Sequence, residues 1–103
     1  MYARLVSLSG ADPEKRENAI RTMQETVLPT LRSYDGFAGY IGLYDEANRR
    51  AKGILLWESK EAAEAAEETL AERRKQMAGG VGLTVESADL YEAPVVELEK
   101  AHV

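Results

Sequence analysis

One short stretch, residues 51–59, constrains the fold more than any other part of the chain; it reads Ala-Lys-Gly-Ile-Leu-Leu-Trp-Glu-Ser. The residues from Ile54 to Trp57 are all apolar, without polar alternation, which is typical of a strand that is buried on both faces. Ser59 is a favourable helix N-cap, and the residues 60–77 that follow it favour a long helix. The stretch therefore predicts a central strand that leads directly into a helix.

The remaining sequence predicts three more strands and one more helix. Strand-forming residues occur at 2–9, 37–44 and 83–92, and the polar segment 45–50 is short enough to join the second strand to the third, 51–58, as a hairpin. The element order is β-α-β-β-α-β. It predicts a ferredoxin-like α+β fold, with two helices on one face of a four-stranded antiparallel sheet.

The first helix has a clear start and an interruption. Asp12 and Pro13 are an N-cap acid and a proline suited to the first helical position. The spacing of its apolar residues predicts one buried stripe, made of Ile20, Met23, Val27 and Leu31. Pro29 lies inside this stripe, so the helix is expected to kink or restart there. The second helix is expected to end at Gly79-Gly80.

The two faces of the predicted sheet are both apolar. Ile54 and Leu56 point away from Leu55 and Trp57, and two helices can cover only one face. The other face would leave a large apolar patch, which predicts a two-fold homodimer that pairs the uncovered faces. Residues 1–103 are expected to form one domain, with 93–103 as a C-terminal extension.

Composition excludes several classes of protein. The net charge of -5, without a basic run that carries aromatic residues, argues against nucleic-acid binding. The chain has no cysteine, no apolar leader and no apolar run long enough to span a membrane, so a cytoplasmic protein is expected. His102, the only histidine, is expected to be solvated near the chain end. No metal site or hydrolase triad is predicted, and the second helix is expected to present a solvated acidic face, made of Glu61, Glu64, Glu67 and Glu68.

Two further motifs connect the chain to a known family. They are Tyr-Asp-Gly-Phe-Ala-Gly at 34–39 and Leu-Trp-Glu-Ser at 56–59, before an alanine-rich helix. With the element order, they resemble the dimeric α/β-barrel superfamily, and within it the antibiotic-biosynthesis-monooxygenase-like family, over nearly the whole chain. The resemblance implies a ligand pocket between the sheet and the helices, and a dimer through the opposite face.

The resemblance also implies a function. The leading expectation is a small-molecule-binding protein that oxidises an aromatic or polyketide-type substrate without a cofactor; the alternative is a non-catalytic ligand-binding or assembly module with the same dimeric fold. Haem-degrading members carry a histidine on the second helix and an asparagine on the first strand, and neither occurs here, so haem degradation is not expected. Cofactor-independent members pair a third-strand tryptophan with an asparagine; Trp57 matches, but Gly53 stands at the asparagine position.

No catalytic residue is assigned, but six residues are candidates for a small aromatic ligand's site: Trp57, Tyr40, Tyr44, Leu55, Met23 and Arg4. If the hairpin is symmetric, the two tyrosines share the face of Leu55 and Trp57, and nearby glycines remove side-chain volume. Trp57 and the tyrosines could instead fill the core. Arg4 could bind an anionic group, or it could be ion-paired or exposed at an edge.

Overall fold

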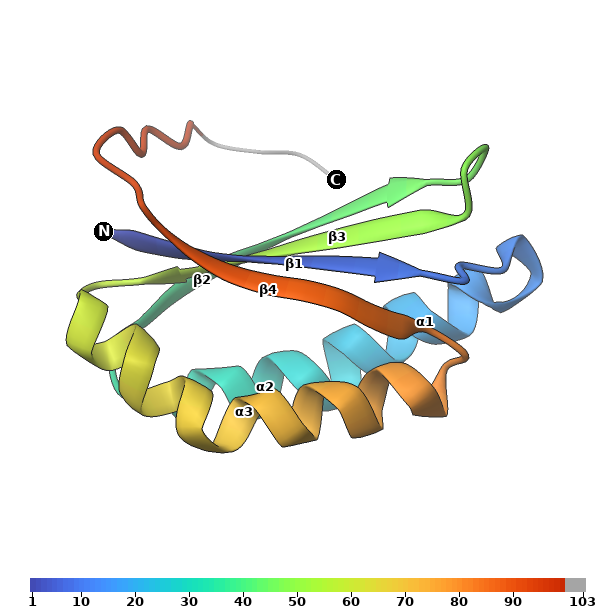
Figure 1. Ribbon diagram of the computed structural model, residues 1–103, viewed down its shortest axis with the longest axis horizontal. Coiled ribbons are helices and arrows are strands. Elements are labelled where there is room, and N and C mark those ends of the chain that lie inside the picture. The colour runs from blue at the N-terminus through green and yellow to red at the C-terminus, as the bar shows by residue number, and fades with distance from the viewer. Residues whose placement is uncertain (100–103) are drawn as a thin grey trace.

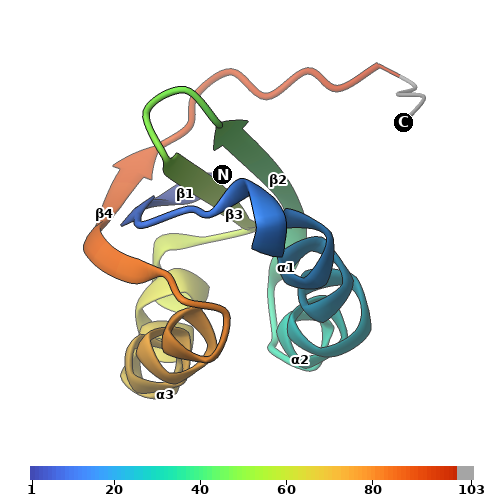
Figure 2. The same cartoon turned by 90° about the vertical axis from the view of Figure 1, so that its right-hand side faces the viewer.

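The computed structural model describes residues 1–99, in which helices lie on one side of a four-stranded antiparallel sheet (Figure 1). The strands are β1 (Tyr2–Ser9), β2 (Phe37–Asp45), β3 (Arg50–Trp57) and β4 (Thr84–Glu92). They lie in the order β2-β3-β1-β4, so β1 and the apolar β3 are the two central strands. The predicted ferredoxin-like arrangement is confirmed, and Figure 2 shows both helical segments on the same side of the sheet.

The first helical segment is divided into four short pieces. They are η1 (Pro13–Lys15), α1 (Arg16–Thr22), the π-helical turn η2 (Met23–Val27) and α2 (Leu28–Arg32). Pro29 has no N–H, and its ring crowds the carbonyl four residues earlier, so a regular α-helix cannot pass through it. Instead the N–H of Leu28 donates to the carbonyl of Met23, five residues back. The expected interruption thus takes the form of a widened turn ahead of the proline.

The π turn changes which side chains of this segment face the core. Leu31 is 2% exposed and lies in the core, whereas Ile20 is 46% exposed. The prediction that Ile20 and Leu31 share one buried stripe is therefore wrong. A turn with one extra residue rotates the helical face by about a third of a turn, so a stripe counted at α-helical spacing does not continue across it.

The second helix, α3 (Lys60–Gly80), begins as predicted, since the hydroxyl of Ser59 accepts a hydrogen bond from the N–H of Ala62. It ends at Gly80, within the predicted glycine pair, but its cap differs from the prediction. Val81 is the C-cap, and Gly82, which follows it, adopts a φ of 79°. The N–H of Leu83 then donates to the carbonyl of Ala78 at 2.7 Å, as in a Schellman motif. The left-handed position, and not the glycine pair, determines where the helix stops.

The core lies between the sheet and the helices, and its buried members are Val6, Leu31, Leu55, Trp57, Ala63, Ala66 and Leu70. The small alanines of α3 allow this helix to approach the sheet closely. Within the described residues, no helix is both long enough and apolar enough to span a membrane.

The opposite face of the sheet carries exposed apolar side chains on its outer strands. Ile41 and Leu43 of β2 are 38% and 48% exposed, and Tyr91 of β4 is 53% exposed. On central β3, however, Leu56 is only 5% exposed; it pairs with Gly39 of β2 and Ala3 of β1, and its Cδ1 atom lies over Gly39. The expectation that Leu56 contributes to the uncovered patch therefore needs correction: the patch is carried by the outer strands.

The segment after β4 contains neither a helix nor a strand within residues 93–99. The N–H of Ala93 donates to the carbonyl of Met1, which extends the pairing of β4 with β1 by one bond. Beyond it the segment lies on the side of the sheet opposite the helices (Figures 1 and 2). Val95 and Leu98 are 81% and 68% exposed, so this extension presents apolar side chains to its surroundings.

Candidate functional site

The sheet face beneath the helices is built from four rows of side chains that run across the strands. From one end they are Phe37, Trp57, Tyr2, Glu92; then Tyr40, Leu55, Arg4, Leu90; then Gly42, Gly53, Val6, Ala88; and finally Tyr44, Ala51, Leu8, Val85. Because Tyr40 pairs with Leu55 and Tyr44 pairs with Ala51, the prediction that both tyrosines share the face of Leu55 and Trp57 is confirmed. We call the third row, which holds two glycines, a valine and an alanine, the small-residue row.

Trp57 fills the first row and is 1% exposed. Its ring makes edge contacts with Phe37, at a centroid distance of 5.5 Å, and with Tyr34, at 6.4 Å. The hydroxyl of Tyr34 forms a 2.6 Å hydrogen bond with that of Thr69, which connects the end of the first helical segment to α3. Trp57 could line a ligand site or fill the core. Its burial and its contacts with Phe37 and Tyr34 support a core residue within an aromatic cluster.

The ring of Tyr40 lies over the small-residue row. A Cβ atom built on Gly53 would lie 2.7 Å from the Tyr40 hydroxyl oxygen and 3.1 Å from its Cε2 atom. A Cβ atom built on Gly42 would lie 3.3 Å from the Tyr40 Cε1 atom. The phenol thus fills the space that the two glycines leave, and burial raises the pKa of Tyr40.

Tyr44 occupies the last row, at the open end of the site. The guanidinium of Arg16 lies 4.5 Å from the centroid of its ring, a cation–π contact between α1 and β2. The Tyr44 hydroxyl is buried and has no hydrogen-bond partner in the described part of the chain. Two hollows meet at this ring. The larger, of about 110 Å³, is lined by Leu43, Tyr44, Asp45, Arg50, Ala51 and Lys52.

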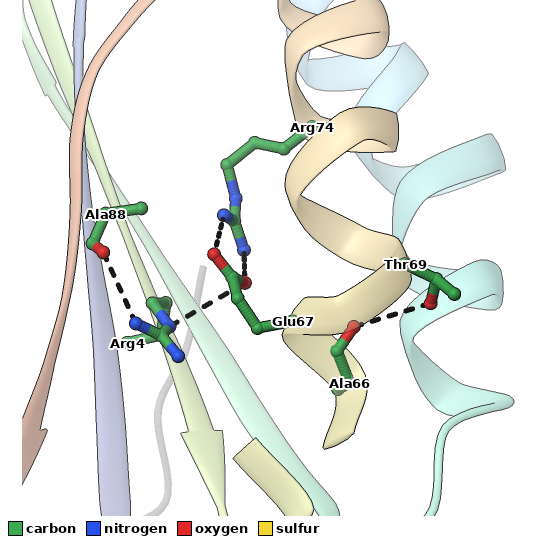
Figure 3. A network of polar contacts seen from close by, with 6 residues as sticks. All are labelled: Arg4, Ala66, Glu67, Thr69, Arg74 and Ala88. Carbon is green, nitrogen blue, oxygen red and sulfur yellow. Dashed lines mark hydrogen bonds and ion pairs between the residues drawn. The ribbon is translucent and has the colours of Figure 1, made fainter. Parts of the chain in front are cut away.

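Arg4 takes part in a polar network between β1, β4 and α3 (Figure 3). Its Nε lies 3.7 Å from a carboxylate oxygen of Glu67, and its Nη1 donates to the carbonyl of Ala88 at 3.3 Å. Arg74 donates two hydrogen bonds of 2.8 Å to the same carboxylate. Of the alternatives for Arg4, the ion-paired one is confirmed. Two guanidinium groups share one carboxylate here, so this network carries an excess positive charge.

The sequence interpretation missed two members of this network. Glu67 was expected on a solvated helix face, yet its side chain is 23% exposed, and that of Arg74 is 13% exposed. The two residues are seven positions apart, a spacing that brings both to the core-facing side of α3. This spacing, together with the charged Arg4 in a central strand, could have predicted that both side chains turn toward the sheet.

The six candidate residues are only partly brought together. Trp57 and Leu55 belong to the core cluster, and Tyr40 packs against it. Met23 is half-buried in η2 outside that cluster, Tyr44 lies at the far end, and Arg4 turns toward α3. Their role in ligand binding stays a prediction. Residues 1–99 contain no group of three or more acidic or histidine side chains that could hold a metal ion, and His102 lies outside the described residues.

No family model matches the chain, and no curated protein matches it either. Solved structures do match. A monooxygenase from the gene ActVA-Orf6 of Streptomyces coelicolor, in complex with the ligand nanaomycin D, is 16% identical, with a TM-score of 0.68 over 96% of this chain and 92% of that chain. SnoaB, a cofactor-independent oxygenase from Streptomyces nogalater, is 15% identical, with a TM-score of 0.65 over 95% of this chain and 97% of that chain.

A dimeric ferredoxin-like protein from an uncultured marine organism is 9% identical, with a TM-score of 0.68 over 96% of this chain and 100% of that chain. At such identities the likeness establishes the fold alone. The chain has the ferredoxin-like fold of the antibiotic-biosynthesis-monooxygenase-like proteins, and the resemblance predicted from the sequence is confirmed at that level.

Proposed function

We propose that this protein binds a small planar aromatic molecule between the sheet and the helices, and oxidises it with O₂ without a cofactor. The observation that carries the proposal is the small-residue row, where two paired glycines leave a flat floor the size of an aromatic ring. The fold supports the reaction class, since one solved structure of this fold holds nanaomycin D and another is a cofactor-independent oxygenase.

The proposed reaction converts a phenol with a free para position, together with O₂, into a quinone and water. One oxygen atom becomes the new carbonyl, and the other leaves as water with the two hydrogens that the phenol loses. The protein's contribution is to position the electron-rich substrate and to exclude water. The cationic network around Arg4 would favour the deprotonated phenol.

We also propose that the working unit is a homodimer formed through the open face of the sheet. Ile41, Leu43 and Tyr91 expose apolar area on that face, which a second copy would remove from water. A ferredoxin-like neighbour that is described as dimeric supports this arrangement.

Oxygen uptake tests the catalytic part of the proposal. The protein is mixed with 1-naphthol, and separately with a dihydronaphthoquinone, and O₂ consumption is compared with autoxidation in buffer. We expect saturable uptake with 1-naphthol, with one O₂ consumed for each quinone formed. Added catalase should return no O₂, because the proposed products are the quinone and water and not hydrogen peroxide. Uptake no faster than autoxidation on both substrates would contradict the oxygenase.

A non-catalytic ligand-binding module is the second candidate function. The specific observation in its favour is Gly53, which stands where the cofactor-independent members of the family carry an asparagine. In that case aromatic compounds would quench the emission of Trp57 saturably, while O₂ consumption stayed at the autoxidation rate.

A further inference from the structure

We infer that Tyr40 is the gate of the proposed aromatic site: its phenol occupies, in the free protein, the place on the small-residue row that a planar ligand takes when it binds. The inference rests on the proposed function only in the location of the site. It adds that the site is closed at rest, and that opening it requires one side chain to turn away.

The position of the Tyr40 ring over the two glycines is the first observation. Atoms on both edges of the phenol lie within van der Waals reach of the missing Cβ positions, Cε2 and the hydroxyl oxygen above Gly53 and Cε1 above Gly42. The ring therefore spans two strands and covers the cross-strand glycine pair, which faces it with no side chains of its own. An aromatic ring already fits this floor, and a cavity lined by apolar side chains that is vacated by one ring is large enough to hold another.

The position of Tyr40 in the sheet is the second observation. Tyr40 lies on β2, an edge strand, and it is only partly buried at the margin of the core cluster. Trp57 lies on a central strand, belongs to the cluster and is 1% exposed. The same face thus combines a fixed aromatic side chain and a releasable one.

A buried hydroxyl lies one row beyond the small-residue row, on the same strand and face as Tyr40. It belongs to Tyr44 and has no protein partner in the described chain, which is destabilising for a buried polar group. A hydroxylated or quinonoid ligand on the small-residue row brings oxygen atoms toward this end of the face. The gate therefore opens toward a region that favours oxygen-bearing aromatic ligands over plain hydrocarbons.

The gate makes a quantitative prediction, because a ligand whose site is mostly closed binds with an apparent affinity reduced by the open fraction. We test it with juglone, a hydroxylated naphthoquinone, and follow quenching of the single tryptophan. The chain has no cysteine that the quinone could alkylate. Tyr40→Ala removes the gate and should bind juglone about tenfold more tightly than wild type, corresponding to an open state disfavoured by about 1.4 kcal/mol. Tyr40→Phe keeps the ring and should stay close to wild type.

Tyr44→Ala is the matched control, since it removes a tyrosine from the same face and strand without touching the glycine pair. It should not bind juglone more tightly. An affinity of Tyr40→Ala equal to or weaker than wild type would overturn the gate, because Tyr40 would then be a wall of the site or a core residue.

A second measurement follows the wild-type protein itself and needs one conservative variant only to assign a resonance. The five tyrosines are replaced by 3-fluorotyrosine, and the Tyr40 resonance is assigned by its loss in Tyr40→Phe. On saturation with juglone, the Tyr40 fluorine should become more accessible to a soluble relaxation agent than it is in the free protein. A Tyr40 fluorine that stays protected would overturn the gate. Tight juglone binding by Tyr40→Ala without oxygen uptake would reject the oxygenase and leave the gate standing.

Discussion

At the scale of single residues, the phenol of Tyr40 has a consequence for stability at high pH. Burial raises the pKa of Tyr40 above its ordinary value of 10.0, so deprotonation favours the unfolded chain. The resulting stability is complete below about pH 10 and is lost as the pH rises through the folded-state pKa. We expect the free energy of unfolding, measured with urea, to fall less steeply above about pH 10 in Tyr40→Phe than in wild type.

The same two proteins provide the control at lower pH, where the Tyr40 phenol stays protonated in both the folded and the unfolded chain. The difference in unfolding free energy between Tyr40→Phe and wild type should be constant below about pH 9 and should change only above about pH 10. A difference that is the same at every pH would show that the effect does not come from the burial of Tyr40.

Glu67 also makes a prediction at this scale, because two arginines share its carboxylate. Glu67→Gln leaves the charges of Arg4 and Arg74 facing each other without a counter-ion. Removing one partner of a fully buried ion pair costs about 3–5 kcal/mol; Glu67 is 23% exposed, so we expect about 1–3 kcal/mol by urea unfolding. Glu64→Gln breaks an exposed pair with Lys60 on the same helix and should change stability by less than about 0.5 kcal/mol. Equal effects would contradict a special role for the buried network.

At the scale of elements, Gly79 and Gly82 at the C-terminal end of α3 are glycines for different reasons, so their substitution by alanine should have opposite effects on stability. Gly82 has a φ of 79°, where an alanine is strained, so Gly82→Ala should destabilise the protein by about 1 kcal/mol. Gly79 lies inside the helix, and a Cβ atom there would meet nothing within 4 Å, so Gly79→Ala should stabilise it by about 0.4–1 kcal/mol. Opposite signs in thermal unfolding would confirm that Gly82 caps the helix; destabilisation by both would place the cap at the glycine pair 79–80.

At the scale of the whole molecule, the open sheet face makes the dimer testable. Leu43 and Ile20 are almost equally exposed, at 48% and 46%, but Leu43 lies on the open face and Ile20 on the helical side. Leu43→Asp should halve the mass measured by light scattering, because it places a charge in the proposed interface. Ile20→Asp should leave the mass unchanged. A wild-type protein that is monomeric at micromolar concentration would contradict the dimer.

A substitution at Leu56 would test the dimer less well than one at Leu43. Leu56 was expected to face the partner, but it is 95% shielded in the single chain, where it is 5% exposed. A charge at position 56 would therefore disrupt the packing of one subunit, and the result would not report on the interface.

The sequence by itself determined the order of the elements and the alternation of their faces. Both follow from local patterns: the apolar run at 54–57, the serine cap at Ser59 and the short polar hairpin segment each act through neighbouring residues, so they hold in any packing of this chain. They sufficed to place Tyr40, Tyr44, Leu55 and Trp57 on one face of the sheet.

Only the tertiary structure decided what these residues do on that face. Whether two paired glycines leave a cavity or a floor for the Tyr40 ring depends on a side-chain rotation that no pattern along the chain records. The same holds for Arg4, whose partners are 63 and 84 positions away in sequence. Contacts between distant residues are set by packing and by the cost of leaving a charge or a hydroxyl unpaired, and those energies exist only once the chain has folded.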